Sequence, residues 1–163
     1  MGKVISVLLI LVGLGVGVFL YFRFSNQSLV EKQLELNEQK FVLLVPKNLG
    51  FKETVNNNTK VLGFGRQGED ISAVGLSHIK LSSLESADKI AQISCKQAFV
   101  AVVEGKSLKV CADKESKGDI FLHMDLIENT NVYNLSVITK ADYFESNEGQ
   151  NKIKRIFGSL SRK

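Results

Sequence analysis

The chain has 163 residues, of which 44% are apolar and 23% charged, with a formal net charge of +4. Domains cluster near ~100–150 residues, so this length predicts one domain and excludes a large multidomain enzyme. The apolar fraction is ordinary for a globular protein and excludes a wholly disordered chain.

The segment from Val4 to Phe22 is a run of 19 residues without a charge. As a helix it spans ~28 Å, close to the ~30 Å hydrocarbon core of a bilayer. The alternatives are a buried core helix and a cleaved signal peptide. A signal peptide has an apolar region of only ~7–15 residues and a small-residue cleavage site, which the flank Tyr21–Ser28 lacks. We therefore predict that residues 1–24 are an uncleaved transmembrane anchor.

Basic residues flank this span on both sides, with Lys3 before it and Arg23 after it. Since the N-terminal flank is very short and everything that can fold follows the span, we expect the flank to stay inside. This predicts a single-pass protein of the inner (cytoplasmic) membrane with its C-terminal domain outside the cytoplasm. Gly13 and Gly17 form a small-xxx-small pair that allows a homodimer through the membrane helix, although Gly is also simply common in such helices.

Residues 25–40 mix charged side chains with Leu29, Val30, Leu34 and Leu36. This thin apolar stripe is typical of a short amphipathic helix or a stalk. We therefore predict a connector at residues 25–40 and a folded domain at residues 41–163.

Within that domain, β-rich runs alternate with polar turns. Strands are expected at residues 41–45, 60–66, 71–79, 99–103, 107–112, 119–127 and 132–139. A central helix should begin at Ser82, which forms a capping box with Glu85, and should carry Cys95 and Ala98. A last helix, capped by Asn147 with Gln150, should bury Ile153, Ile156, Phe157 and Leu160.

This order of elements predicts an α+β fold. An antiparallel β-sheet should carry the central and the C-terminal helix packed on it, preceded by the single N-terminal transmembrane helix.

The start of the domain has a strand followed by Pro46, a short turn and the aromatic Phe51. It resembles the start of PsbP-like domains, whose usual Trp after the Pro turn is absent here. The likeness continues in outline through two strands, a helix with a Ser-rich cap, a meander and a closing helix, and covers residues 41–163. It implies a non-enzymatic module that docks onto a membrane assembly, with no catalytic residues to carry over.

The chain contains two cysteines, Cys95 and Cys111. A bridge would close a loop of ~15 residues and contribute about 3 kcal/mol in the chain-entropy model. Two Cys in an exported domain often pair, so we expect a disulfide, with two buried thiols as the alternative. Because two thiols without nearby partners cannot supply four ligands, no metal site is expected.

Some patterns resemble chemical sites without meeting their requirements. Residues 63–68 match the dinucleotide fingerprint, but Glu69 and Asp70 follow where a helix should begin, so we expect a hairpin turn and no cofactor. His123 and Asp125 share a strand face but lack a positioned nucleophile, and the carboxylates are scattered, so no enzyme activity is expected.

Basic residues gather at the C-terminus, namely Lys152, Lys154, Arg155, Arg162 and Lys163. Nucleic-acid binding calls for a basic patch interleaved with aromatic side chains, so no nucleic-acid partner is expected. A solvated helix face is the preferred interpretation, and attraction to anionic lipid headgroups is the alternative.

These features predict a membrane-anchored extracytoplasmic module that binds an unidentified protein partner. It would serve an envelope or secretion assembly, or act as an immunity-type inhibitor. The competing prediction is a small-ligand or lipid carrier, which needs an apolar cavity between helix and sheet. A hydrolase is a third alternative.

Overall fold

The computed structural model describes residues 28–56, 59–84, 90, 95–114 and 118–163. The predicted membrane span, with Gly13 and Gly17, lies outside the described residues, and so does most of the predicted central helix. None of the helices in the described part of the chain has the length and apolar character needed to cross a membrane.

The described residues form two sheets and two helices near the C-terminus. The strands are β1 (Leu29–Leu36), β2 (Gln39–Pro46), β3 (Gly50–Asn56), β4 (Thr59–Gly65), β5 (Ile71–Lys80), β6 (Gln97–Val103), β7 (Lys106–Lys114), β8 (Asp119–Glu128), β9 (Asn131–Lys140) and β10 (Ser161–Arg162). The helices are α3 (Ala141–Glu145) and α4 (Asn147–Gly158).

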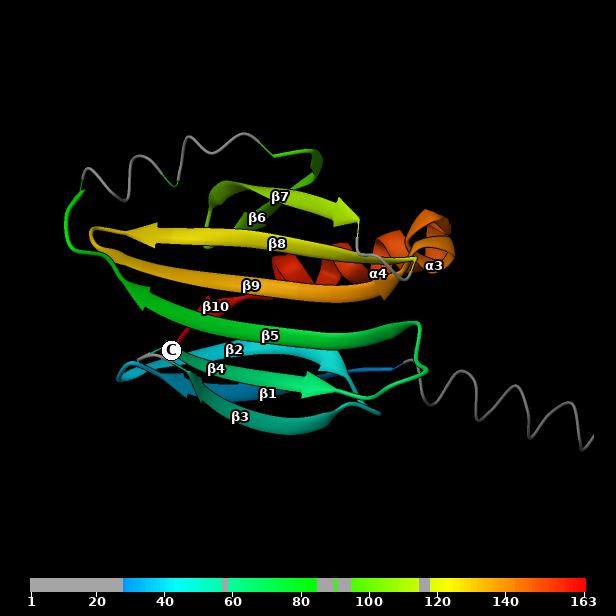
Figure 1. The fold of residues 1–163 in the computed structure, drawn as a ribbon, viewed down its shortest axis with the longest axis horizontal. Coiled ribbons are helices and arrows are strands. Elements are labelled where there is room, and N and C mark those ends of the chain that lie inside the picture. Colours follow the sequence, from blue (N-terminus) through cyan, green and yellow to red (C-terminus); the bar gives the residue numbers. More distant parts are fainter. Residues whose placement is uncertain (1–27, 57–58, 85–89, 91–94, 115–117) are drawn as a thin grey trace, which may run out of the picture.

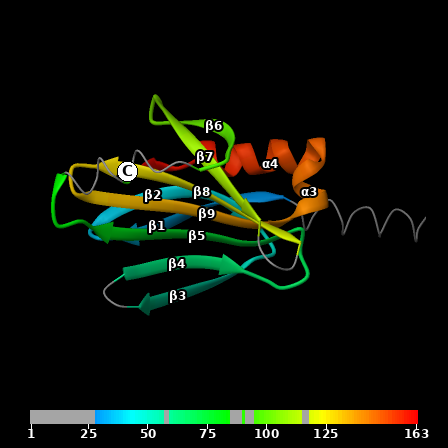
Figure 2. The ribbon, with the colours of Figure 1, turned by 45° about the horizontal axis from the view of Figure 1, so that its top comes forward.

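The strands pair antiparallel in two sheets. The large sheet has seven strands in the order β3-β4-β5-β9-β8-β7-β6, and the small sheet has three, in the order β1-β2-β10. The small sheet and α4 lie on the same side of the large sheet (Figures 1 and 2). There β1 contacts β4, and α4 contacts β2 and β6. The core fills the space between these layers, so each strand of the large sheet has one core-facing side.

The predicted α+β fold, with an antiparallel sheet and a C-terminal helix, is confirmed. On β8 the core-facing side chains are those predicted by alternation, and all are buried: Ile120, Leu122, Met124 and Leu126. The four predicted apolar residues of the last helix region are also buried, each at most 1% exposed. The predicted cap of Asn147 with Gln150 is wrong by one residue: the N-cap is Ser146, whose Oγ accepts a hydrogen bond from the Gly149 amide at 3.0 Å.

The prediction of an amphipathic helix or stalk at residues 25–40 is wrong for Leu29–Leu36, which form β1. This strand pairs along its whole length with β2. Leu34 and Leu36 are 6% and 1% exposed, because side chains two residues apart lie on the same side of a strand. β1 is therefore part of the folded domain, which includes residues before residue 41.

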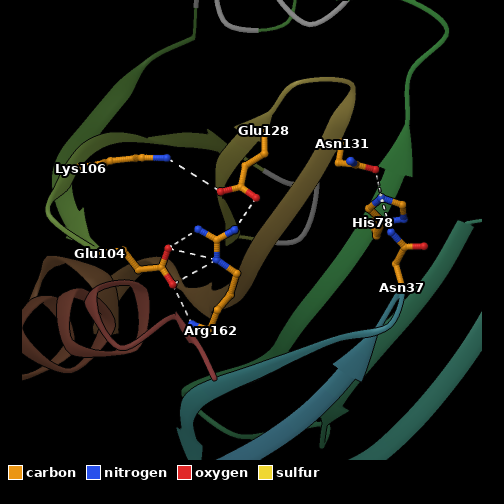
Figure 3. Close-up of polar contacts among 7 residues, drawn as sticks. All are labelled: Asn37, His78, Glu104, Lys106, Glu128, Asn131 and Arg162. Carbon is orange, nitrogen blue, oxygen red and sulfur yellow. Dashed lines mark hydrogen bonds and ion pairs between the residues drawn. The ribbon is translucent and has the colours of Figure 1, made fainter.

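The C-terminus is fixed by Arg162, which lies in β10 next to Phe41 of β2. Its guanidinium Nη2 lies 2.6 Å from Glu104 Oε2, and its Nη1 donates to Glu128 (Figure 3). Lys106 Nζ lies 3.9 Å from the Glu128 carboxylate. The hydrogen bonds from Arg162 hold the pKa of Glu104 below its usual value of 4.5. Arg162 thus joins the end of the chain to the turn that follows β6 and to the last residue of β8.

A candidate binding cleft between the two sheets

A cleft of about 600 Å³ lies where the free edges of the two sheets meet, beside β1 and β3. The wall from β1 and the turn after it includes Lys32, Leu34 and Asn37. The wall from β3 and β4 includes Phe51 and Phe64. Such a volume lies within the range typical of binding sites in proteins.

The cleft exists because the large sheet extends past the cover that the small sheet provides. Phe51 and Phe64 are opposite each other in the pairing of β3 with β4, so both lie on the core-facing side. Phe64 is 4% exposed, whereas Phe51 is 57% exposed. Val55 lies four residues after Phe51 on the same side of β3 and is 67% exposed. The apolar face of the sheet thus continues outward into an uncovered strip.

Charged side chains of both signs surround this apolar strip. Glu53 lies between Phe51 and Val55, and its carboxylate is 3.0 Å from Lys60 Nζ. Both side chains of this ion pair are nearly half exposed, so the pair contributes at most ~1 kcal/mol to stability. The β1 side of the cleft adds Lys32 and Glu35. The cleft therefore has an apolar floor with a charged rim.

One end of the cleft is held by the turn between β1 and β2. Asn37 and Glu38, which line the cleft, both have positive φ, at 53° and 61°. The side-chain amide nitrogen of Asn37 lies 3.4 Å from His78 Nε2. The same His78 Nε2 is 3.0 Å from Asn131 Oδ1 (Figure 3). The His78 ring also packs on Tyr133, with centroids 4.9 Å apart. The turn is thereby tied to β5 and β9 of the large sheet.

The two cysteines are joined. Cys95 and Cys111 form a disulfide with their Cα atoms 5.7 Å apart. The sequence predicts Cys95 on the central helix. Instead it lies outside any helix, just before β6, and Ala98 belongs to that strand. The bridge therefore links the start of one strand to its neighbour, β7.

The other predicted site residues do not come together with the cleft. His123 Nε2 lies 3.5 Å from Asp113 Oδ2 on β7, while Asp125 Oδ1 accepts a hydrogen bond from Asn134 at 2.7 Å. The glycine pattern at residues 63–68 forms the end of β4 and a hairpin turn, as predicted, with φ of +83° at Gly68. In the described residues no group of three or more His, Cys, Asp or Glu side chains is arranged to hold a metal ion.

The C-terminal basic residues are spread over different surroundings. Lys154 Nζ lies 5.9 Å above the ring of Phe99, and burial lowers the pKa of Lys152. Arg162 is bound by two carboxylates. These three side chains therefore do not act as one basic patch.

Sequence reasoning missed the cleft because it missed β1 and β3. A usable signal was present at the first of these strands. Leu34 and Leu36 alternate with charged residues, and the polar pair Asn37 and Glu38 follows them, which is typical of a hairpin. Compared with models of known protein families and with curated proteins, the chain matches none.

Proposed function

We propose that the protein is a polypeptide-binding module of the cell envelope, anchored in the inner membrane by residues 1–24. Its cleft between β1 and β3 holds a segment of a partner protein. The observation that carries this proposal is the exposure of Phe51, which lines the cleft, and of Val55, which lies beyond it on the same core-facing side of β3. Exposed apolar side chains within a polar rim are typical of protein interaction sites.

The chemistry of the cleft supports a polypeptide over the alternative lipid or small-ligand cargo. A carrier of that kind needs an apolar cavity between helix and sheet. Ile153, Ile156 and Phe157 fill that part of the core, since all three are fully buried. The cleft lies at the β1 edge of the small sheet. Its rim of Lys and Glu side chains suits the backbone and mixed side chains of a protein segment.

The number of residues between the proposed span and β1 sets an upper limit on the distance between the domain and the bilayer. Seven residue steps separate Phe22 from Leu29, which reach about 25 Å when fully extended. The strand then continues for eight residues, so its far end, where the cleft is lined by Asn37, lies about 23 Å beyond its start. The anchor therefore keeps the domain near the membrane, while the cleft remains accessible to a partner in the envelope.

The resemblance to PsbP-like domains agrees with this proposal. The resemblance rests on the order of elements after the Pro turn: strands, a helix with a Ser-rich cap, a meander and a closing helix. Most of the residues expected to form the capped helix lie outside the described part of the chain. We propose the non-enzymatic docking role of those domains for this chain on that basis.

Site-specific photo-crosslinking in cells tests the proposed function. A photoreactive side chain at Phe51 of the full chain should crosslink to one defined polypeptide. The matched control is Val100, which is 52% exposed on the opposite edge strand and should not give that product. Equal products from both positions, or crosslinks to lipid alone, would contradict the proposal.

The membrane topology has its own test. A reporter active only outside the cytoplasm, fused after Lys163, should be active and should stay in the membrane fraction. A soluble full-length product, or one shortened by about 25 residues as signal-peptide cleavage leaves it, would rule out the anchor.

A further inference from the structure

We infer that β3 is a strand-addition site. The partner segment binds in extended conformation as an eighth strand of the large sheet and places alternate side chains against Phe51 and Val55. This inference rests on the proposed function and specifies the conformation and the side-chain pattern of the bound segment.

The edge formed by β3 is regular enough to accept another strand. Its pairing with β4 runs without a break from Gly50 opposite Gly65 to Asn56 opposite Thr59. The other edge strand, β6, has a register shift between Gln97 and Phe99, and the disulfide lies beside it. Bulges and irregular pairing protect an edge from strand addition, whereas a flat edge presents unpaired backbone N–H and C=O groups. Of the two edges of the large sheet, β3 is the one open to pairing.

On one side of β3, exposed apolar side chains are positioned to contact an added strand. Phe51, Glu53 and Val55 alternate along the core-facing side of β3. Side chains directly opposite them on an added strand would lie ~4.5–5.5 Å away, close enough to cover both apolar residues. The facing wall of the cleft, from β1, contains the buried Leu34 and the exposed Lys32. The added strand would thus be enclosed by both sheets on this face.

The charge of Glu53 sets the central position of the bound segment. Lys60 pairs with this carboxylate, but both side chains remain more than 40% exposed. A basic side chain opposite Glu53 gains a cross-strand charge pair, and an acidic one is repelled. The segment that fits therefore has five positions in the order apolar, any residue, basic, any residue, apolar.

The same charge argues against a second copy of this chain as the occupant. The two-fold antiparallel pairing of β3 with itself that matches Phe51 with Val55 places Glu53 against Glu53 at its centre. Like charges directly opposite in a sheet are destabilising. An acyl chain is disfavoured as well, since it offers no groups to the backbone edge and would meet a charged rim. An extended segment of a different protein can both pair with the backbone of β3 and cover Phe51 and Val55.

The test uses a displayed library of random nonapeptides, selected on the full chain in lipid nanodiscs. The expected sequences have the apolar and basic residues at alternate positions given above. Phe51→Asp should lower the binding affinity of the selected peptides at least tenfold. Val100→Asp should leave that affinity within twofold of its value for the parent. Binding should slow amide hydrogen exchange in β3 and leave exchange in β6 unchanged.

A charge reversal gives the sharpest readout. Repeating the selection on Glu53→Lys should change the preferred central residue from basic to acidic, while the two apolar positions persist. All variants should unfold cooperatively with midpoints close to that of the parent, which separates lost binding from lost folding. Peptides with helical spacing, peptides indifferent to Phe51→Asp, protection confined to β6, or an unchanged central residue would each overturn strand addition. Crosslinking from Phe51 in cells would still support polypeptide binding, so failure of the two proposals is distinguishable.

Discussion

Phe51 and Phe64 face each other across β3 and β4 with their ring centroids 5.3 Å apart, yet their exposures are 57% and 4%. Both rings lie on the core-facing side of the same sheet. The difference arises because β1 contacts β4, so the cover that the small sheet gives Phe64 stops short of Phe51. One aromatic residue therefore belongs to the core, and most of its neighbour's ring is exposed in the cleft.

Truncating these two rings should separate stability from binding. Phe64→Ala should lower the free energy of unfolding by ~3–5 kcal/mol, because a buried ring leaves a cavity. Phe51→Ala should cost less than ~1 kcal/mol, since most of that ring is already in water. Urea denaturation followed by circular dichroism measures both. Equal losses would mean that the cleft is closed and that Phe51 belongs to the core.

The extent of β1 predicts where the chain can be shortened. A protein that begins at Ser28 should fold, because the first strand and the hydrogen bond from the Lys47 amide to the Ser28 carbonyl, at 2.9 Å, are retained. A protein that begins at residue 41 should not, since it exposes the core side of β2 and loses the buried Leu34 and Leu36. Near-ultraviolet circular dichroism and proteolysis compare the two. A folded shorter protein would restore the connector interpretation.

The parts of the fold that were predictable from the sequence are those whose burial is uniform along the strand. On β8 every second residue from Ile120 to Leu126 is buried, so alternation alone identifies the strand and its core side. The last helix was found in the same way, because Ile153, Ile156 and Phe157 repeat at helical spacing and all face the core.

The cleft was not predictable in this way, since its walls include the edge strands β1 and β3. Charged residues occupy positions on β1 and β3 that central strands would give to apolar side chains, as Lys32 and Glu53 do on their cleft-facing sides. The patterns therefore look like a polar connector. The difference in exposure between Phe51 and Phe64 depends on how far the small sheet extends over the large one. No local sequence pattern indicates that extent.

The contact between Arg162 and Glu104 predicts an acid sensitivity. Hydrogen bonds from Arg162 lower the pKa of Glu104 in the folded state below its ordinary value of 4.5. A carboxyl with a depressed folded-state pKa contributes stability at pH values above the unfolded pKa. That contribution is lost as pH falls through the folded pKa. The parent should therefore lose more stability than Glu104→Gln when the pH is lowered from 6 to 3.

Thermal unfolding across this pH range measures the effect. Glu53→Gln is a matched control, because Glu53 is also a surface carboxylate in an ion pair but is 46% exposed. The difference between the pH profiles of the two variants isolates the effect of the Arg162 contact. Identical profiles for Glu104→Gln and the parent would show that the Arg162 contact contributes nothing to stability.

The packing of α4 on the large sheet gives a further stability prediction. Phe157 is fully buried and lies edge-on to Phe99 of β6, with ring centroids 5.7 Å apart. Phe157→Ala should cost ~3–5 kcal/mol. Lys154→Ala should cost only ~0.5–1 kcal/mol, the size of an exposed cation–π contact, since its Nζ lies 5.9 Å over the same Phe99 ring. Equal small losses in chemical denaturation would mean that the helix is a loose tail.

The disulfide should act as a staple that is independent of the cleft. Cys95 and Cys111 are 16 residues apart, and the double variant Cys95→Ala, Cys111→Ala should lose ~2–4 kcal/mol of stability. Alkylation of membranes under non-reducing conditions should label neither thiol before reduction. Since Cys111 lies on β7 and the cleft borders β3, with four strands between them in the sheet, crosslinking from Phe51 should persist in the double variant. Free thiols in fresh membranes would refute the bridge and remove a support for export of the domain, because such bonds persist in oxidising compartments.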